Sequence, residues 1–384
     1  MRCLLVGEFN LENLAGLLRN DDTPPRLDDV IVAPYGQTVP TLIDPAAECW
    51  HPEPDLTVVW TLPEQTSPSF ARLQEHDFAD VAQVEGEVAE FCDLLREASR
   101  RTGTLLVVSW TQPAHRRGLG LLDARPGVGA THALWRMNCV LSERLQDCGN
   151  VFVLPGGRWQ ALAGPKGSSA KLWFMGKIPF GPSVFAEATQ DIKAAARAIR
   201  GMARKLVIVD LDDTLWGGVV GDVGWENLVL GGHDPEGEAY VAFQRGLKAL
   251  ARRGVVLGIV SKNEEDVALE AIDRHPEMVL RRDDFVGWRI DWSDKAAGVA
   301  SLTDELNLGL ASVVFIDDSP VEPTTIEDEL TLRVFPDTRD TAPYDCPTTA
   351  PILEDAWNVL EKRFVVDPKN PRSGRGGILE ANAL

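Results

Sequence analysis

The sequence lacks the features that mark several large classes of protein. Its 6 cysteines are scattered, at positions 3, 49, 92, 139, 148 and 346, and none belongs to a Cys-x-x-Cys pair. This pattern argues against a disulfide framework or a cysteine zinc site and is typical of reduced thiols in a cytoplasm. No stretch approaches the roughly 18 apolar residues of a membrane span, and the start, MRCLLVGEFN, has too short an apolar run for a signal peptide. We therefore expect a cytoplasmic protein that does not contact a membrane.

Positive charge is also scarce. The 384 residues include 38 Lys and Arg against 58 Asp and Glu, which gives a formal net charge of −20. This excess of negative charge argues against nucleic acid or an anionic membrane surface as the main partner. It does not exclude phosphorylated small molecules, because a bound metal ion can reverse the sign of a pocket. The chain is long enough for two domains, each with its own core.

Residues 1–170 predict an α/β domain. Short apolar runs indicate buried strands at 1–6, 30–33, 55–60, 105–109 and 151–154. An amphipathic helix is expected over 80–100, and strands that alternate with helices are typical of a mainly parallel sheet covered on both faces. The loop at 7–10 (GEFN) offers no Ser nucleophile after the first strand, and His115 and His132 are interpreted as surface or loop residues. We expect a degenerate, non-catalytic domain that binds something.

Residues 171–203 are predicted to connect this domain to a second one. The stretch 172–181 (LWFMGKIPFG) is aromatic, then basic, then interrupted by Pro and Gly, which indicates an irregular arm. Its aromatic side chains are expected to fill the seam between the domains; direct contact with substrate is the alternative. The Ala-rich stretch 191–202 is expected to form a helix that leads to the next strand.

The second half is organised around a strand that ends in carboxylates. Residues 206–209 (LVIV) indicate a buried strand, and Asp210, Asp212 and Asp213 follow it directly. Ligands of open α/β sheets bind beyond the carboxyl ends of the strands. Two acids spaced i, i+2 at such an end can act as nucleophile and general acid/base, and clustered carboxylate oxygens suit Mg²⁺. The alternative is a solvated acidic turn.

A Gly-rich segment follows these acids. Trp216, Gly217, Gly218 and Trp225 belong to a stretch that predicts a hairpin-like flap, able to admit substrate and to exclude water. A helix over 237–251 comes after it.

The other candidate residues also follow strands or open helices. A strand at 255–260 precedes Ser261, Lys262 and Asn263, whose side chains suit a phosphate oxygen, although a helix cap is the alternative. Lys295 opens a helix, a position that the helix dipole mildly disfavours for a cation. A strand at 313–316 ends in a second acidic pair, Asp317 and Asp318, and 330–335 predicts an edge strand.

This order of motifs, Asp-x-Asp-x-Thr, Ser, Lys and Asp-Asp, resembles the haloacid dehalogenase (HAD) superfamily over about 204–336. The residues within and around these motifs resemble the FkbH-like branch of that superfamily. The stretches that carry this resemblance are DLDDTLWGGVVGDVG (210–224), VSKNEE (260–265), HPEM (275–278), FIDDSPVE (315–322) and KLWFMGK (171–177). Long members of that branch carry an amino-terminal domain similar to SGNH hydrolases. The resemblance implies an α/β chain with two domains, an SGNH/flavodoxin-like one over 1–170 and a HAD-type Rossmann-like catalytic one over 204–350, followed by a helix and a flexible tail over 351–384.

The resemblance also implies roles for individual residues. Asp210 is the expected nucleophile for a phosphoryl group, and Asp212 the expected acid/base for the leaving group. Mg²⁺ is expected on Asp210, the main-chain carbonyl of Asp212, and Asp317 or Asp318. The phosphate is expected to contact Thr214, Ser261, Lys262, Asn263 and Lys295.

Relatives of this branch take a glyceryl unit from 1,3-bisphosphoglycerate, remove the phosphate and load the unit onto an acyl carrier protein in polyketide and related secondary metabolism. Two departures bear on that activity. Such relatives often carry a Cys in the strand before the first Asp, where this chain has Leu206. Cys139 is a candidate substitute, but we expect it to be a buried structural thiol. Pro323 stands where the branch usually has Arg. A plain phosphatase or phosphotransferase is therefore a near-equal alternative. A non-catalytic protein that docks a carrier protein is a third.

Overall fold

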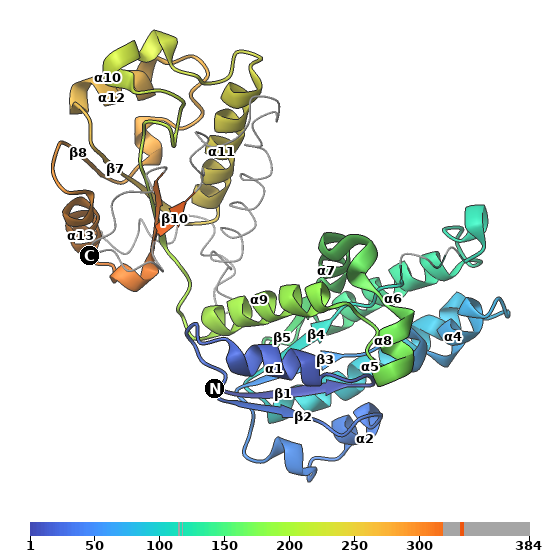
Figure 1. Ribbon diagram of the computed structural model, residues 1–384. Helices are drawn as coiled ribbons and strands as arrows, with labels where there is room; N and C mark the ends of the chain where they lie inside the picture. Colours follow the sequence, from blue (N-terminus) through green and yellow to red (C-terminus); the bar gives the residue numbers. More distant parts are fainter. Residues whose placement is uncertain (114–115, 117, 318–330, 334–384) are drawn as a thin grey trace. The chain divides into compact units, whose positions relative to one another are not determined.

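The computed structural model describes residues 1–113, 116, 118–317 and 331–333 (Figure 1). The chain divides into two compact units, with the boundary between Arg197 and Ala198. Each unit contains a five-stranded sheet whose paired strands are all parallel. The expected fold class, α/β with two sheet-containing parts, is confirmed. Some expected features lie outside the described residues: Asp318, Pro323, Cys346, His115 and the tail over 351–384.

The first unit has the sheet order β2-β1-β3-β4-β5. Its strands are β1 (Arg2–Gly7), β2 (Asp29–Val32), β3 (Leu56–Trp60), β4 (Thr104–Val108) and β5 (Val151–Leu154). Strands β3 and β4 are buried on both faces, which explains why they read as continuous apolar runs. The order is that of flavodoxin-like sheets, in which the chain changes direction between the first and third strands.

Helices cover both faces of this sheet. They are α1 (Glu12–Asn20), α2 (Thr38–Ile43), α3 (Pro63–Thr66), α4 (Pro68–Gln74), α5 (Val81–Ala98), α6 (Ala130–Leu145), α7 (Gly156–Ala163), α8 (Ala170–Gly176) and α9 (Pro182–Ile199), with 3₁₀ turns at Glu48–Trp50, Ser99–Arg101, Gly120–Leu122 and Gly164–Gly167. Helices α5 and α6 share one apolar cluster with Leu4 and Val6 of β1. Asp80 caps α5 by accepting a hydrogen bond from the backbone of Ala82.

The stretch that connects the two halves is more regular than its sequence suggests. Helix α8 occupies part of the expected irregular arm, and it is capped by the hydroxyl of Ser169. Helix α9 begins at Pro182, well before the expected start at 191. Proline favours the first turn of a helix, because its missing N–H is not needed there. The Pro and Gly of this stretch therefore mark the ends of two helices.

Aromatic rings fill the carboxyl edge of the first sheet, the edge at which open α/β sheets bind their ligands. Trp60, at the end of β3, has four ring neighbours with centroids 4.9–5.7 Å away: Phe9, Trp159, Phe180 and Phe185. A cavity of about 550 Å³ opens nearby, with Asn10 and Tyr35 in its lining. The expectation of a degenerate, non-catalytic domain stays a prediction.

Glu8 lies beside these rings at the end of β1. Its Oε2 atom is buried without a hydrogen-bond partner among the described residues, and burial, helped by the charge of Glu64, raises the pKa of Glu8 to about 7. A carboxyl whose folded pKa exceeds its unfolded value gives most stability below the unfolded value, and that stability is lost as the pH rises. The loss is expected between about pH 4.5 and about pH 7.

Glu8→Gln should therefore raise the unfolding temperature at pH 8 and flatten its fall between pH 5 and pH 7. Scanning calorimetry of the full chain measures both. Glu53→Gln, at an exposed position, is the matched control. A lower unfolding temperature for Glu8→Gln at pH 8 would contradict the interpretation that the Glu8 carboxylate is unfavourably buried.

The second unit has the sheet order β10-β9-β6-β7-β8 over its described strands. The strands are β6 (Leu206–Val209), β7 (Val256–Ser261), β8 (Trp288–Ile290), β9 (Val313–Asp317) and β10 (Thr331–Arg333). The helices are α10 (Val220–Val223), α11 (Pro235–Arg252), α12 (Glu265–Arg274) and α13 (Lys295–Glu305), with 3₁₀ turns at Trp225–Asn227, Arg282–Asp284 and Leu310–Ser312. In the described chain β10 is an edge strand, as expected for 330–335.

Two apolar clusters show how helices cover this sheet. Val207 and Val209 point to a cluster that includes residues of α11 and α12. Leu206 and Ile208 point to the opposite cluster, which includes α13. Because side chains alternate along a strand, β6 is buried on both faces and its backbone is held rigidly. Among the described helices, none has a stretch long and apolar enough to cross a bilayer.

Candidate active site

The carboxyl end of β6 lies at the switch point of the second sheet. The chain runs from β6 to β7 and β8 on one side, and then returns to β9 on the other side. Parallel pairing continues just past the strand, where Asp210 N donates to Ile316 O at 2.9 Å. Side chains that follow β6, β7 and β9 therefore meet at one edge. This is the position at which open α/β sheets bind their ligands.

Lys295 joins the two acidic strand ends. Its Nζ lies 2.9 Å from Oδ2 of Asp210 and 2.8 Å from Oδ2 of Asp317. Asp210 is 5% exposed, Asp317 is 4% exposed, and the Lys295 side chain is 11% exposed. Lys295 is the first residue of α13, whose cap is the carboxylate of Asp294. The unusual lysine at a helix start is thus explained by two buried carboxylates.

One ammonium group does not neutralise two carboxylates. Burial raises the pKa of Asp210, the Asp317 charge raises it further, and the Lys295 ammonium and a hydrogen bond with Ser261 oppose the rise. Burial lowers the pKa of Lys295, but the two carboxylates outweigh burial and hold it above its ordinary value. Oδ1 of Asp210 is buried and has no hydrogen-bond partner among the described residues. The group is one positive charge short of neutral.

These residues fit a magnesium ion. Mg²⁺ prefers oxygen ligands and usually takes one or two carboxylates, with water and phosphate oxygens completing its shell. Asp210 and Asp317 supply two carboxylates, and the unpartnered Oδ1 of Asp210 is an oxygen ready for a cation. Across 1–113, 116, 118–317 and 331–333, no larger group of three His, Cys, Asp or Glu side chains is gathered for a metal. At a site of this kind, water and substrate oxygens would therefore supply the remaining ligands of the metal ion.

Asp212 accepts hydrogen bonds from three N–H donors, none of which belongs to the group of Asp210, Asp317 and Lys295. Its Oδ1 accepts the indole N–H of Trp216 at 2.9 Å and the backbone N–H of Val220 at 3.1 Å. Its Oδ2 accepts Nδ2 of Asn263 at 2.8 Å. Burial raises the pKa of Asp212 above its ordinary value, and the three hydrogen bonds oppose that shift. The two carboxylates of the Asp-x-Asp motif thus occupy different surroundings, as different chemical roles require.

The expected phosphate-contacting residues fall into two groups. Ser261 is the last residue of β7, is 3% exposed and hydrogen-bonds to Asp210. Lys262 is partly exposed next to it. Thr214 is fully buried, and Asn263 is 4% exposed and contacts Asp212. The structure therefore gathers Ser261 with the Lys295 group and places Asn263 on the second carboxylate.

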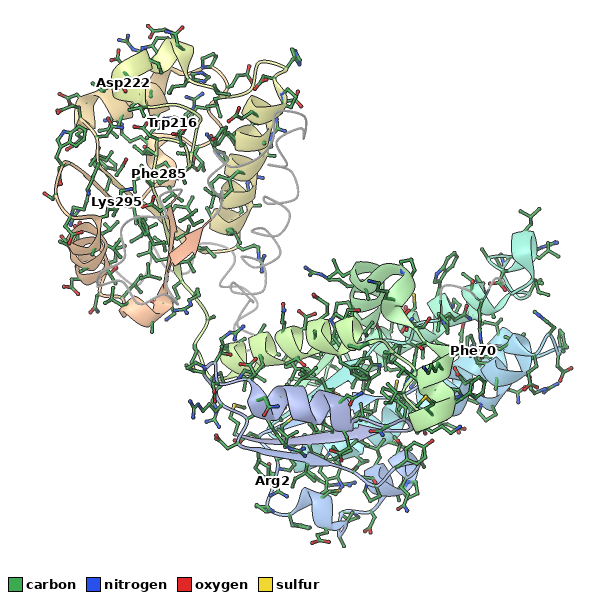
Figure 2. The ribbon with its side chains drawn as sticks, in the orientation of Figure 1. Arg2, Phe70, Trp216, Asp222, Phe285 and Lys295 are labelled. Carbon is green, nitrogen blue, oxygen red and sulfur yellow. The ribbon has the colours of Figure 1, made fainter. Side chains whose placement is uncertain are left out.

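The expected flap is hairpin-like. Gly217 and Val229 exchange two backbone hydrogen bonds, of 3.0 and 2.9 Å, as an antiparallel bridge. A side chain at Gly217 would meet the Val229 side chain at 2.9 Å, and Gly218 has φ +95°, so glycine is required at both positions. Trp216 is fully buried inside the unit (Figure 2) and reaches the site only through its indole N–H. Trp225 packs partly buried against the same core.

Two residues near the site escaped the sequence analysis. Gln244 of α11 is fully buried; it donates to Leu215 O at 2.9 Å and accepts from two backbone N–H groups, at 279 and 280. It supports the turn that follows Asp213. Trp292 is 68% exposed, and its indole N–H donates to Glu264 at 2.9 Å. Neither has a sequence signal, because a Gln in an amphipathic helix and a Trp in a polar loop are typical of ordinary surface positions.

Comparison with known proteins supports the fold. No protein-family profile and no curated protein sequence matches this chain. Among solved structures, the chain is similar to the N-terminal part of protein BF1531 from Bacteroides fragilis, which contains a phosphatase domain and was crystallised in complex with Mg. The TM-score is 0.74 at 25% sequence identity, over 83% of this chain and 84% of the other. The likeness therefore extends over both units.

Proposed function

We propose that the second unit is a Mg²⁺-dependent phosphatase of the HAD type, which transfers a phosphoryl group to Asp210. The observation that carries the proposal is the buried group of Asp210, Asp317 and Lys295, in which one carboxylate oxygen has no hydrogen-bond partner among the described residues. The solved neighbour, with its phosphatase domain and Mg, supports the same chemistry. Phosphoryl transfer requires positioning and charge neutralisation, and these are what the group offers.

In the proposed mechanism a carboxylate oxygen of Asp210 attacks phosphorus while the bond to the leaving oxygen breaks. Asp212 gives its proton to that oxygen, and then takes one from the water that hydrolyses the phosphoaspartate. Lys295 and Ser261 hold phosphoryl oxygens at the same edge. Mg²⁺, held by Asp210, Asp317 and the main-chain carbonyl of Asp212, would supply charge neutralisation when bound.

The finer proposal concerns the donor and the acceptor. The motif wording that resembles the FkbH-like branch favours a three-carbon acyl phosphate of the 1,3-bisphosphoglycerate kind as donor, and the thiol of an acyl carrier protein as acceptor. In that case the first unit, which resembles an SGNH domain without its nucleophile, serves binding. The protein is proposed to act in the cytoplasm, in secondary metabolism.

One observation favours the simpler activity, a phosphatase or phosphotransferase on a free or tethered metabolite. The free cysteines of the described residues, at 3, 49, 92, 139 and 148, all belong to the first unit. Strand β6 carries only aliphatic side chains and is completely buried. A covalent acyl relay on that strand is therefore excluded. The expectation that Cys139 is a buried thiol is wrong, because its side chain is exposed on α6. Cys139 is therefore the relay candidate if loading occurs.

The deciding experiment offers the protein Mg²⁺, 1,3-bisphosphoglycerate and a phosphopantetheinylated carrier protein. Phosphate release is measured together with the intact mass of the carrier. We expect phosphate release that stops when EDTA removes Mg²⁺ and returns when Mg²⁺ is restored. A glyceryl mass increment on the carrier supports loading, and release without an increment supports the plain phosphatase. No phosphate from this donor, from acetyl phosphate or from simple phosphate esters would contradict the proposed function.

A further inference from the structure

Both ends of the Asn263 side-chain amide make hydrogen bonds to protein groups. It follows β7 and is 4% exposed. Its Nδ2 donates to Oδ2 of Asp212 at 2.8 Å, and its Oδ1 accepts the backbone N–H of Glu264 at 3.0 Å. The second contact fixes which end of the amide faces Asp212, because only the NH₂ end can donate. Asn263 is therefore oriented toward the Asp212 carboxylate.

The two carboxylate oxygens of Asp212 accept different numbers of hydrogen bonds. Oδ1 accepts two N–H groups from the segment that follows β6, those of Trp216 and Val220. Oδ2 accepts Asn263, and among the described residues no other hydrogen bond to it is found. A carboxyl with N–H donors on both oxygens does not rotate without losing at least one of them. Oδ2 is thus aimed in a fixed direction and retains a lone pair.

We propose that Asn263 is a positioning residue, which aims Oδ2 of Asp212 at the leaving group and does not bind the phosphoryl group. The inference rests on the proposed function, in which Asp212 protonates the leaving oxygen. An oxygen of Asp210 bonds to phosphorus while the ester P–O bond breaks. At the same time the proton of Asp212 moves from Oδ2 to the leaving oxygen of the ester. General acid catalysis depends on such placement, so loss of the Asn263 donor weakens this step in particular.

The two sides of the carboxyl should differ in importance. Asn263 supplies the single hydrogen bond on Oδ2, whereas Val220 keeps its backbone donor on Oδ1 when the Trp216 indole is removed. Trp216→Phe should therefore lower activity less than Asn263→Ala or the similarly sized Asn263→Leu. Asn20→Ala is the matched control, because Asn20 is an exposed asparagine of the first unit.

The test compares two substrates in the presence of Mg²⁺. The acetate of acetyl phosphate departs without a proton, whereas the alkoxide of ethyl phosphate requires one. For Asn263→Ala we expect kcat/KM, which reports formation of the phosphoaspartate, to fall about 10- to 100-fold on ethyl phosphate and less than about threefold on acetyl phosphate. Hydrolysis of the phosphoaspartate also uses Asp212 and is common to both substrates, so kcat does not discriminate between them. The inhibition constant of inorganic phosphate should stay within about twofold. Circular dichroism verifies that each variant is folded.

Several outcomes would overturn the inference. An equal fall of kcat/KM on both substrates, or a rise of about tenfold in the inhibition constant of inorganic phosphate, would place Asn263 among the phosphate ligands. Activity of the unmodified protein on acetyl phosphate alone would mean that Asp212 protonates no leaving group. Inactivity on both substrates and on 1,3-bisphosphoglycerate would reject the proposed function itself, and the inference with it. If Asn263→Ala does not fold, Asn263→Leu decides by the same criteria.

Discussion

Asp210→Asn should lower the rate of phosphate release by about ten-thousandfold or more while the chain stays folded. The amide that replaces the carboxylate is a far weaker nucleophile, so no phosphoaspartate forms. Stability should respond in the opposite direction. Burial raises the pKa of Asp210, which means that its charge is costly in the metal-free protein, and a neutral amide removes that cost. Lys295 keeps Asp317 as its partner.

The measurement combines turnover with thermal unfolding, with and without Mg²⁺. We expect Asp210→Asn to unfold at the same temperature as the unmodified protein or higher without Mg²⁺, and to lose most of the stabilisation that Mg²⁺ gives. Asp222→Asn, on the exposed flap helix α10 (Figure 2), is the control for the same chemical change. Turnover that survives in Asp210→Asn would show that the nucleophile is a different residue.

The buried strands of the second sheet, and the acidic residues at the ends of two of them, could be predicted from the local pattern of apolar and polar residues. The apolar run 206–209 is bounded by polar residues and is buried as β6, and the run 313–316 is buried as part of β9. Because neighbouring parallel strands end at one edge, Asp210, Ser261 and Asp317 were expected to lie together once their three strands were recognised. These positions depend on short-range periodicity, which a single sequence carries.

What the sequence did not reveal depends on contacts between distant residues. Asn263 follows a strand just as Ser261 does, so its residue type suits a phosphate as well as a carboxylate. Only the folded chain places its Nδ2 2.8 Å from Asp212. Trp216, expected as part of a flap that contacts substrate, is fully buried, and its indole N–H has a carboxylate partner inside the unit. Pattern alone does not distinguish a buried Trp from an exposed one beside glycines.

Lys295→Met should destabilise the metal-free protein by about 3–5 kcal/mol, the usual cost of breaking a buried ion pair on one side. The change leaves Asp210 and Asp317 as two buried carboxylates that both faced the same ammonium, at 2.9 and 2.8 Å. Their mutual repulsion is then no longer offset by that ammonium group. Lys248→Met is the matched control, because Lys248 pairs with Asp284 at 3.0 Å while its side chain is 29% exposed. A partly exposed pair of this kind contributes about 0–1 kcal/mol.

Magnesium should rescue Lys295→Met more than it stabilises the unmodified protein. A divalent cation between the two carboxylates restores the charge balance that the lysine provided, so the increment in unfolding temperature with Mg²⁺ should be larger in the variant. Turnover should nevertheless stay low, because the phosphoryl group has lost the lysine that stabilises it. Titration with Mg²⁺ during thermal unfolding measures the increment. If Mg²⁺ shifts Lys295→Met and Lys248→Met equally, then the carboxylates of Asp210 and Asp317 do not hold the metal.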